Sequence, residues 1–279
     1  MAIDEKMTQS IELLRKGEKL ALKMQPDVGY YVAFSGGKDS QVLFQLCRLA
    51  GVRFKAYYNV TTNDPADNIS FIRHYYPEVT FTQPQKSYFQ LIAHKGLPTS
   101  QHRWCCAIFK ERNGAGYTIL TGVRRQESQK RAQYAPVVRW GRTIEQREQL
   151  SLSKMETNHF ECVDGKDKIM IYPILDWTED EVWQFIDQQN IPHNPCYQQT
   201  GRVGCVYCPF APARKIRTYI KHHPKQHAAF LHALDRYLGK SSLASNFDNS
   251  EDYFEWWLSK VSLNEYKLKK RQLTLIFPQ

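Results

Sequence analysis

The chain of 279 residues is 42% hydrophobic and 24% charged, with a formal net charge of +10 and a pI near 9.2. No stretch reaches the roughly 20 apolar residues that a membrane span needs, and residues 1–10 lack the basic and apolar regions of a signal peptide. We therefore expect a globular, cytoplasmic protein without membrane contacts. Its seven cysteines favour thiols, metal ligands or redox groups over a disulfide framework. The positive charge is compatible with a nucleic-acid partner, but a nucleotide pocket alone would also account for it.

Patterns typical of strands and helices alternate through the first two thirds of the chain. In chain order they predict a helix over 7–24, a strand over 29–34, a helix over 40–49, a strand over 52–60, a helix over 68–75, and strands over 79–82, 117–121 and 168–173. This alternation predicts an α/β fold with a doubly wound, mostly parallel sheet, in which ligands bind at the carboxyl ends of the strands.

The other segments are expected to be irregular or helical. Residues 131–154 are polar and weakly periodic, which predicts a long loop or a partly ordered excursion. Residues 190–212 are rich in Pro, Gly and Cys, which predicts irregular structure. Thr178 and Glu181 have the spacing of a capping box at the start of a helix. Further helical patterns cover 214–238 and 251–261, and a basic tail follows at 267–271.

This organisation predicts two parts. A nucleotide-binding domain is expected over 1–212, with an inserted loop over 131–167. A helical, basic C-terminal extension is expected over 213–279.

A candidate phosphate loop, Ser-Gly-Gly-Lys-Asp-Ser, runs from Ser35 to Ser40 between the first strand and its helix. Its glycines let the backbone approach a phosphate, while N–H groups and the helix N-terminus supply positive potential. Lys38 adds a charge, and Asp39 and the two serines offer oxygens for phosphate contacts or Mg2+. The hexapeptide is not a Walker A loop. It resembles the PP-loop of the ATP pyrophosphatases, which split ATP between its α and β phosphates. The alternative is a turn that only caps a helix.

Two close cysteine pairs, Cys105-Cys106 and Cys205 with Cys208, could together supply four thiolates to one metal site. The arrangement resembles the 4Fe-4S signature of adenylylsulfate reductases and of the related DNA phosphorothioation sulfurtransferases. Zinc and buried structural thiols are the alternatives. Of the other cysteines, Cys47 is expected in the core, Cys162 has no evident partner, and Cys196 could lie near the cluster and handle sulfur.

A second candidate binding segment begins at Gly122, after an expected strand. Arg124, Arg125 and Arg131 follow, and their planar donor groups suit phosphate or sulfate. A solvated helix start is the plainer interpretation. The segment resembles the G-x-R-R-x-x-S-x-x-R stretch of the phosphoadenylylsulfate reductase superfamily, as do 173–183 and 194–209. Together these matches cover roughly 28–212, and they imply an adenine nucleotide alpha hydrolase-like, Rossmann-like fold.

The superfamily resemblance implies one of two chemistries. A sulfonucleotide reductase attacks its substrate with a C-terminal cysteine, but no cysteine follows Cys208 here, and reductases have a degenerate PP-loop whereas this one is intact. Both departures favour adenylation of an acceptor by ATP followed by sulfur transfer, as in DNA phosphorothioation or tRNA thiolation, with the DNA branch preferred. The rivals are a reductase that uses Cys196 or a partner's thiol, and a non-catalytic nucleotide sensor.

These interpretations assign roles to individual residues. Catalytic roles are expected for Lys38, Asp39 and Arg125. Nucleotide binding is expected of Ser35, Gly36, Gly37, Lys38, Asp39, Ser40, Gly122, Arg124 and Arg131. Cys105, Cys106, Cys205 and Cys208 are expected to hold the metal. Asp64 is a second candidate carboxylate and His102 a candidate neighbour of the cluster, although a turn residue and a surface residue are the plainer interpretations.

The expected cofactors are ATP, Mg2+ and a 4Fe-4S cluster, with Zn2+ as the alternative to the cluster. The expected partners are nucleic acid, either DNA or tRNA, and a cysteine desulfurase or persulfide carrier. A homodimer is the assembly considered.

Overall fold

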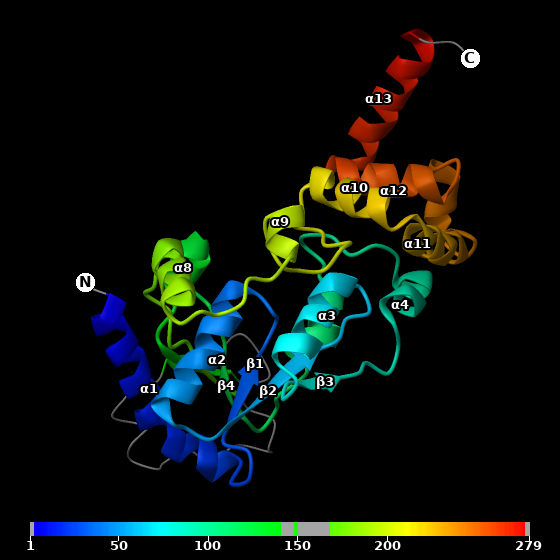
Figure 1. Ribbon diagram of the computed structural model, residues 1–279. Helices are drawn as coiled ribbons and strands as arrows, with labels where there is room; N and C mark the ends of the chain where they lie inside the picture. The colour runs from blue at the N-terminus through cyan, green and yellow to red at the C-terminus, as the bar shows by residue number, and fades with distance from the viewer. Residues whose placement is uncertain (1–2, 141–147, 150–167, 277–279) are drawn as a thin grey trace. The chain divides into compact units, whose positions relative to one another are not determined.

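The computed structural model describes residues 3–140, 148–149 and 168–276 (Figure 1). The chain folds into two compact units. Unit 1 consists of residues 1–60, 64–83 and 107–204, and unit 2 consists of 61–63, 84–106 and 205–279. Cys162 lies outside the described residues. Among the helices that are described, none is long and apolar enough to cross a bilayer.

Unit 1 is built on a sheet whose described strands are arranged in the order β3-β2-β1-β4-β7-β5-β6. The strands are β1 (Tyr30–Ala33), β2 (Phe54–Asn59), β3 (Thr80–Thr82), β4 (Thr118–Leu120), β5 (Val137–Trp140), β6 (Glu148–Gln149) and β7 (Lys168–Ile171). The first five in the spatial order pair in parallel, whereas β5 is antiparallel to both β7 and β6. The predicted doubly wound, mostly parallel sheet is confirmed.

Unit 1 also contains helices and short helical turns. They are α1 (Ile3–Met24), α2 (Lys38–Ala50), α3 (Ala66–Tyr75), η1 (Ala107–Glu111), η2 (Arg125–Glu127), α6 (Gln129–Ala132), α8 (Glu179–Gln188) and α9 (Cys196–Thr200). Helix α2 packs against both α1 and α8. Leu14, Val32, Leu43 and Phe185 join one buried cluster, which explains why β1 and its neighbours are apolar on both faces. The predicted capping box of Thr178 and Glu181 begins α8.

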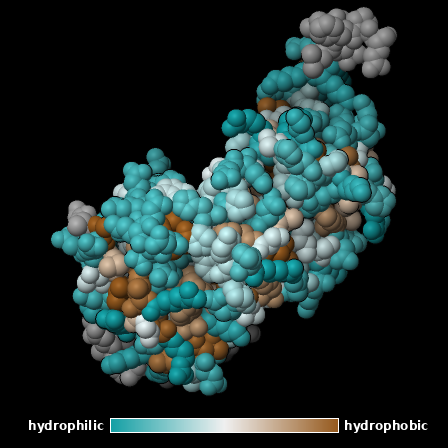
Figure 2. Space-filling view, in the orientation of Figure 1, coloured by the Kyte–Doolittle hydropathy of each residue, from teal (hydrophilic) through white to brown (hydrophobic). Residues whose placement is uncertain are grey.

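Unit 2 is helical. Its helices are α4 (Tyr88–Lys95), α5 (Trp104–Cys106), α10 (Ala213–His222), α11 (Pro224–Leu238), η4 (Ser242–Asn246), α12 (Ser250–Ser259) and α13 (Leu263–Ile276). Helix α11 packs against α4, α10 and α12. At the centre, the rings of Tyr207 and Phe230 stack with their centroids 3.8 Å apart, and Phe254 meets both rings edge-on. The visible face of α10 to α13 carries mostly hydrophilic residues (Figure 2).

Two segments that were expected to be largely irregular contain regular elements. The expected loop over 131–154 contains β5, where Val137 and Val138 pair with β7, because β-branched residues fit a sheet even in a polar stretch. The expected irregular segment over 190–212 contains α9, which ends at Gly201 in the left-handed conformation. Of the predicted inserted loop, β6 pairs with β5, and residues 141–147 and 150–167 lie outside the described residues.

Two further elements differ from the sequence patterns. The predicted helix over 214–238 is divided at His223, because Pro224 begins α11 and disfavours a helical residue before it. Helix α4 was not predicted, although Ser87 and Gln90 form a capping box at its start.

The division into 1–212 and 213–279 stays a prediction about domains. The compact units have other bounds, because residues 84–106 pack with the helices after 205.

Ser10 links α1 to the segment after β7 through a buried hydroxyl. Its Oγ donates to Pro173 O at 2.7 Å and accepts from Trp177 Nε1 at 3.1 Å. We expect Ser10→Ala to lower the free energy of unfolding by about 1–3 kcal/mol, because it leaves a buried donor and acceptor unpaired. Thr8→Ala is the matched control, since Thr8 is exposed on the same helix and bonds only Asp4 O. Urea denaturation of both variants tests this, and equal effects would contradict it.

Candidate nucleotide and cysteine sites

The candidate nucleotide site lies where the strand order of the sheet reverses. Strand β1 has β2 on one side and β4 on the other, and α/β sheets bind ligands at the carboxyl ends of strands around such a point. The segments that follow β1 and β4 meet there, with the backbone of Gly122 packed against the backbone of Asp39. The contact is so close that a Cβ atom added to Gly122 would lie 2.8 Å from the carbonyl carbon and oxygen of Asp39. Thr121, at the end of β4, has a buried hydroxyl without a hydrogen-bond partner among the described residues.

Two buried asparagines hold the phosphate loop. Gly36 has φ +75°, and a Cβ there would lie 2.4 Å from Asn68 Oδ1. Asn68 Nδ2 donates to Ser35 O at 3.2 Å, and Asn194 Nδ2 donates to Gly36 O at 2.9 Å and to Asn68 Oδ1 at 2.7 Å. The loop therefore needs glycine at 36 and both amides around it. The sequence analysis did not single out either asparagine.

The hydroxyl groups of the two serines form hydrogen bonds within the phosphate loop. Ser40 Oγ accepts from Ser35 N at 3.1 Å and donates to Gly37 O at 2.8 Å. Ser35 Oγ lies 3.1 Å from Ser40 Oγ. Both serines thus shape the loop.

Asp39 lies between two cations. Arg124 Nε donates to Asp39 Oδ1 at 2.7 Å, and Lys38 Nζ donates to Asp39 Oδ2 at 3.1 Å. Arg124 is only 3% exposed, and Lys38 Nζ is also 3.6 Å from Glu179 Oε1. The carboxylate therefore fixes the direction of both cations at the entrance of the loop.

The other two predicted arginines lie apart from this group. Arg125 Nε is 2.8 Å from Asp176 Oδ1, and Arg131 pairs with Glu127 one helical turn earlier. Both are more exposed than Arg124. The structure thus brings Arg124 to the loop and gives Arg125 and Arg131 partners outside it.

Tyr197 on α9 is a functional candidate that the sequence analysis missed. Its hydroxyl accepts from Lys38 N at 2.8 Å and would lie 3.3 Å from a Cβ on Gly37. Burial raises the pKa of Tyr197 to about 12, so the hydroxyl keeps its proton at neutral pH. Because it accepts from Lys38, its own O–H is directed to another acceptor, which a phosphate oxygen could be. The only signal was its place within the superfamily-like segment 194–209.

The four predicted cysteine ligands all belong to unit 2. A hydrogen bond with Cys106, then burial, then the charges of Cys106 and Cys205 raise the pKa of the Cys105 thiol. Burial, followed by the charges of Cys105, Cys205 and Cys208, raises the pKa of Tyr88. Tyr88 contacts the neighbours of both pairs: its ring stacks on Trp104, beside Cys105, and its hydroxyl donates to Tyr207 O, between Cys205 and Cys208, at 3.1 Å. Cys196 belongs to unit 1 and is buried.

The Cys205–Cys208 turn is clamped by Asn63. Val206 N donates to Asn63 O at 2.8 Å, Tyr207 N donates to Asn63 Oδ1 at 3.0 Å, and Asn63 Nδ2 donates back to Tyr207 O at 3.4 Å. Thr61 Oγ1 lies 3.7 Å from Cys205 Sγ. These bonds fix the backbone that carries the second cysteine pair.

The surroundings of the cysteines suit a sulfur-ligated group. Beside Cys105, the indole Nε1 of buried Trp104 has no hydrogen-bond partner within the described chain, and such a donor can serve an anionic sulfur. In the described part of the chain, however, no three His, Cys, Asp or Glu side chains are arranged to hold a single metal ion. Cysteine thiolates are the ligands of iron-sulfur clusters, so the residue types suit such a group, although the described residues are not gathered into a formed metal site.

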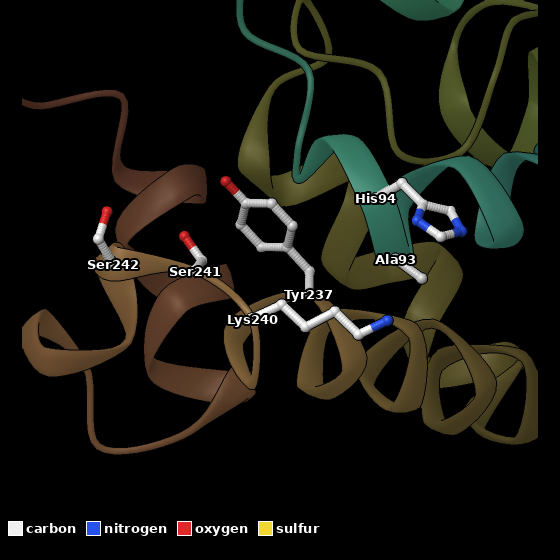
Figure 3. A pocket seen from close by; sticks show the side chains of 6 residues that line it. All are labelled: Ala93, His94, Tyr237, Lys240, Ser241 and Ser242. Carbon is white, nitrogen blue, oxygen red and sulfur yellow. The ribbon is translucent and has the colours of Figure 1, made fainter.

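A separate pocket lies in unit 2, between the end of α4 and the segment after α11 (Figure 3). It has a volume of about 330 Å³ and is lined by Ala93, His94, Tyr237, Lys240, Ser241 and Ser242. None of these is a predicted site residue.

Residues 29–211 match the family of the phosphoadenosine phosphosulfate reductase domain, so the chain belongs to this family, which is one of enzymes. It is 27% identical over 193 residues to an uncharacterized protein of Methanocaldococcus jannaschii, covering 64% of this chain and 41% of that protein. It is 31% identical over 87 residues to the adenosine 5′-phosphosulfate reductase of Allochromatium vinosum, covering 31% and 33%. The chain thus spans less than half the length of these curated relatives.

Solved structures resemble the chain more distantly. The phosphoadenylyl-sulfate reductase of Candida auris, in a phosphate complex, is 16% identical, with a TM-score of 0.45 over 73% of this chain and 93% of that one. A tRNA thiolase of Methanococcus maripaludis, solved with its 4Fe-4S cluster, is 14% identical, with a TM-score of 0.39 over 86% and 83%. Neither defines what this chain binds.

Two left-handed glycines flank α2 and provide a matched pair of variants. Gly36→Ala adds a Cβ against Asn68 and Ile72, whereas Gly51→Ala meets nothing within 4 Å. Both variants carry about 1–2 kcal/mol of backbone strain. We expect Gly36→Ala to weaken ATP binding by about tenfold or more, equivalent to about 1.4 kcal/mol, because the loop must shift. Gly51→Ala should bind as the unmodified chain does. Titration calorimetry with ATP tests this, and equal affinities for the two variants would contradict it.

Proposed function

We propose that this protein is an ATP-dependent adenylating sulfurtransferase that acts on a nucleic-acid acceptor and uses a cysteine-bound iron-sulfur cluster. The observation that carries the proposal is the intact Ser35–Ser40 loop at the reversal point of the sheet, with Arg124 and Lys38 fixed beside it. Such a loop suits a substrate with phosphates beyond the α position. The four cysteines in unit 2 add a sulfur-binding element.

The loop supplies donors to the phosphates of ATP. Lys38 and Arg124 already converge on Asp39, and Tyr197 keeps a protonated hydroxyl next to the Lys38 amide. These groups would stabilise the charge that develops on departing pyrophosphate. Both Asp39 oxygens accept from cations, so its first role is to orient them. Its remaining lone pairs could bind Mg2+, which would neutralise phosphate charge when bound.

The proposed chemistry has two steps that balance. An acceptor oxygen attacks the α phosphorus of ATP, the bond from that phosphorus to the bridging oxygen breaks, and pyrophosphate leaves with the electron pair. Hydrosulfide, supplied by a cysteine desulfurase or persulfide carrier, then displaces AMP, which leaves with the former acceptor oxygen. Release of hydrosulfide from a persulfide takes two electrons from a thiol reductant, whereas the displacement of AMP changes no oxidation state. The acceptor is a DNA phosphate or a tRNA base carbonyl, with DNA preferred.

The cysteines would hold the cofactor. Cys105, Cys106, Cys205 and Cys208 are the ligands, and Thr61 and Trp104 lie beside them as donors. With one thiolate on each iron no iron would be left open, so a bound 4Fe-4S cluster would position the incoming sulfur rather than bind it at an iron. Zinc is less suited, because the adjacent pair Cys105-Cys106 strains a closed tetrahedral site on one ion.

A sulfonucleotide reductase is the second candidate. It is favoured by the sequence similarity to adenosine 5′-phosphosulfate reductases, which includes 30% identity over 63 residues to that of Lysinibacillus sphaericus. In that case the arginine and lysine groups would bind the phosphosulfate, and the product would be sulfite.

Product analysis separates the two functions. Anaerobically purified protein is given ATP with duplex DNA, single-stranded DNA, bulk tRNA or no acceptor, and in parallel adenosine 5′-phosphosulfate or its 3′-phosphate form with a thiol reductant. We expect pyrophosphate release from ATP that one nucleic acid stimulates, and no sulfite. Sulfite without pyrophosphate would establish the reductase instead.

Iron content tests the cysteine site. We expect Cys205→Ala to lose the iron and the visible absorption of the cluster, because one of four ligands is removed. Cys47→Ala is the control, since Cys47 is fully buried in α2, outside the proposed site. Circular dichroism checks that both variants are folded. A full complement of iron in Cys205→Ala would contradict the assignment.

A further inference from the structure

Phe210 exposes a large apolar ring next to the cysteine site. Its side chain is 54% exposed, and it stands two residues after Cys208 in a turn closed by the bond from Ala211 N to Cys208 O at 2.9 Å. Pro209 occupies the second position of the turn, where its fixed φ is favoured. Lys260 Nζ donates to Pro209 O at 2.6 Å. The ring is therefore presented by a braced turn.

Arg103 lies beside this ring. Its guanidinium carbon is 5.5 Å from the centre of the Phe210 ring, within the range of a cation–π contact. The carbonyl of Arg103 accepts from Cys106 N at 3.0 Å. Arg103 is thus held in a backbone turn with the first cysteine pair. Phe210 is held in a similar turn with the second pair.

More cations follow on α10, which begins three residues after Phe210. Arg214, Arg217 and Lys221 are exposed on one face of this helix, opposite the buried Ile216 and Tyr219. Arg217 is paired with Glu255. Exposed cations of this kind attract a phosphate backbone.

The exposed ring does not belong to a broad apolar patch. The large hydrophobic side chains exposed in the described residues are Leu49, Tyr75, Phe210 and Leu268. Three of them lie on separate helices, α2, α3 and α13, and Phe210 lies in the turn after Cys208. A protein partner usually requires a contiguous apolar surface. A single ring flanked by cations instead suits a nucleobase, which stacks on aromatic and guanidinium planes while its phosphates contact basic residues.

We propose that Phe210 and Arg103 form a stacking platform for one unpaired base of the acceptor, which holds the nucleic acid beside the cysteine site. This inference rests on the proposed nucleic-acid acceptor and adds to it that the bound segment is single-stranded or contains a flipped base.

The test uses the full-length protein and a stem-loop oligonucleotide with 2-aminopurine at one unpaired position, beside the fully paired duplex. We expect the unmodified chain to prefer the stem-loop and to quench its fluorescence. Phe210→Ala should weaken binding by about five- to one-hundred-fold and abolish the quenching, as expected for loss of one stacked base. Phe210→Trp should restore both, and Arg103→Ala should weaken binding and reduce its salt dependence.

Tyr75→Ala is the matched control, because Tyr75 is 52% exposed but lies on α3 of unit 1. Iron content and ATP affinity of each variant show whether it is intact. If the unmodified chain binds the stem-loop and an intact Phe210→Ala binds it equally well, the platform is refuted while the proposed function stands. If the unmodified chain binds neither oligonucleotide, the nucleic-acid acceptor itself is refuted.

Discussion

The candidate nucleotide site depends on the close approach of the segment after β4 to the first turn of α2. Because Gly122 has no side chain, its backbone can lie against the backbone of Asp39. This contact lets the buried Arg124, two residues later, reach the Asp39 carboxylate. The orientation of the cations is thus fixed when the sheet forms, and a phosphate ligand would not have to order them.

Much of this arrangement could be predicted from the sequence. Strands β1 and β4 are buried on both faces, so they are continuous apolar runs, and the hexapeptide between β1 and α2 has the composition that a phosphate loop requires. Strand β5 was missed because an antiparallel strand near a sheet edge contains polar residues. Local sequence patterns therefore identified the strands that are buried along their whole length, but not a strand with polar residues near the edge of the sheet.

The parts that could not be predicted involve contacts between distant segments. Asn194 and Tyr197 reach the loop from about 160 positions away in the chain, and no local pattern distinguishes them from other polar residues. Spacing likewise could not show which of three arginines meets Asp39. Arg125 and Arg131 form ion pairs with Asp176 and Glu127 instead, and these contacts depend on the folded structure.

The bonds between Asn63 and the Cys205–Cys208 turn have a consequence for the assembly of the cysteine site. In many small metal-binding domains the ligands are ordered only by the metal, so the apoprotein is unfolded. Here the turn is fixed by an amide side chain and its own backbone, and its conformational entropy is lost during folding. Insertion of a cofactor would then resemble the docking of a ligand into a preorganised receptor. An apoprotein with this turn could accept the proposed cofactor without refolding.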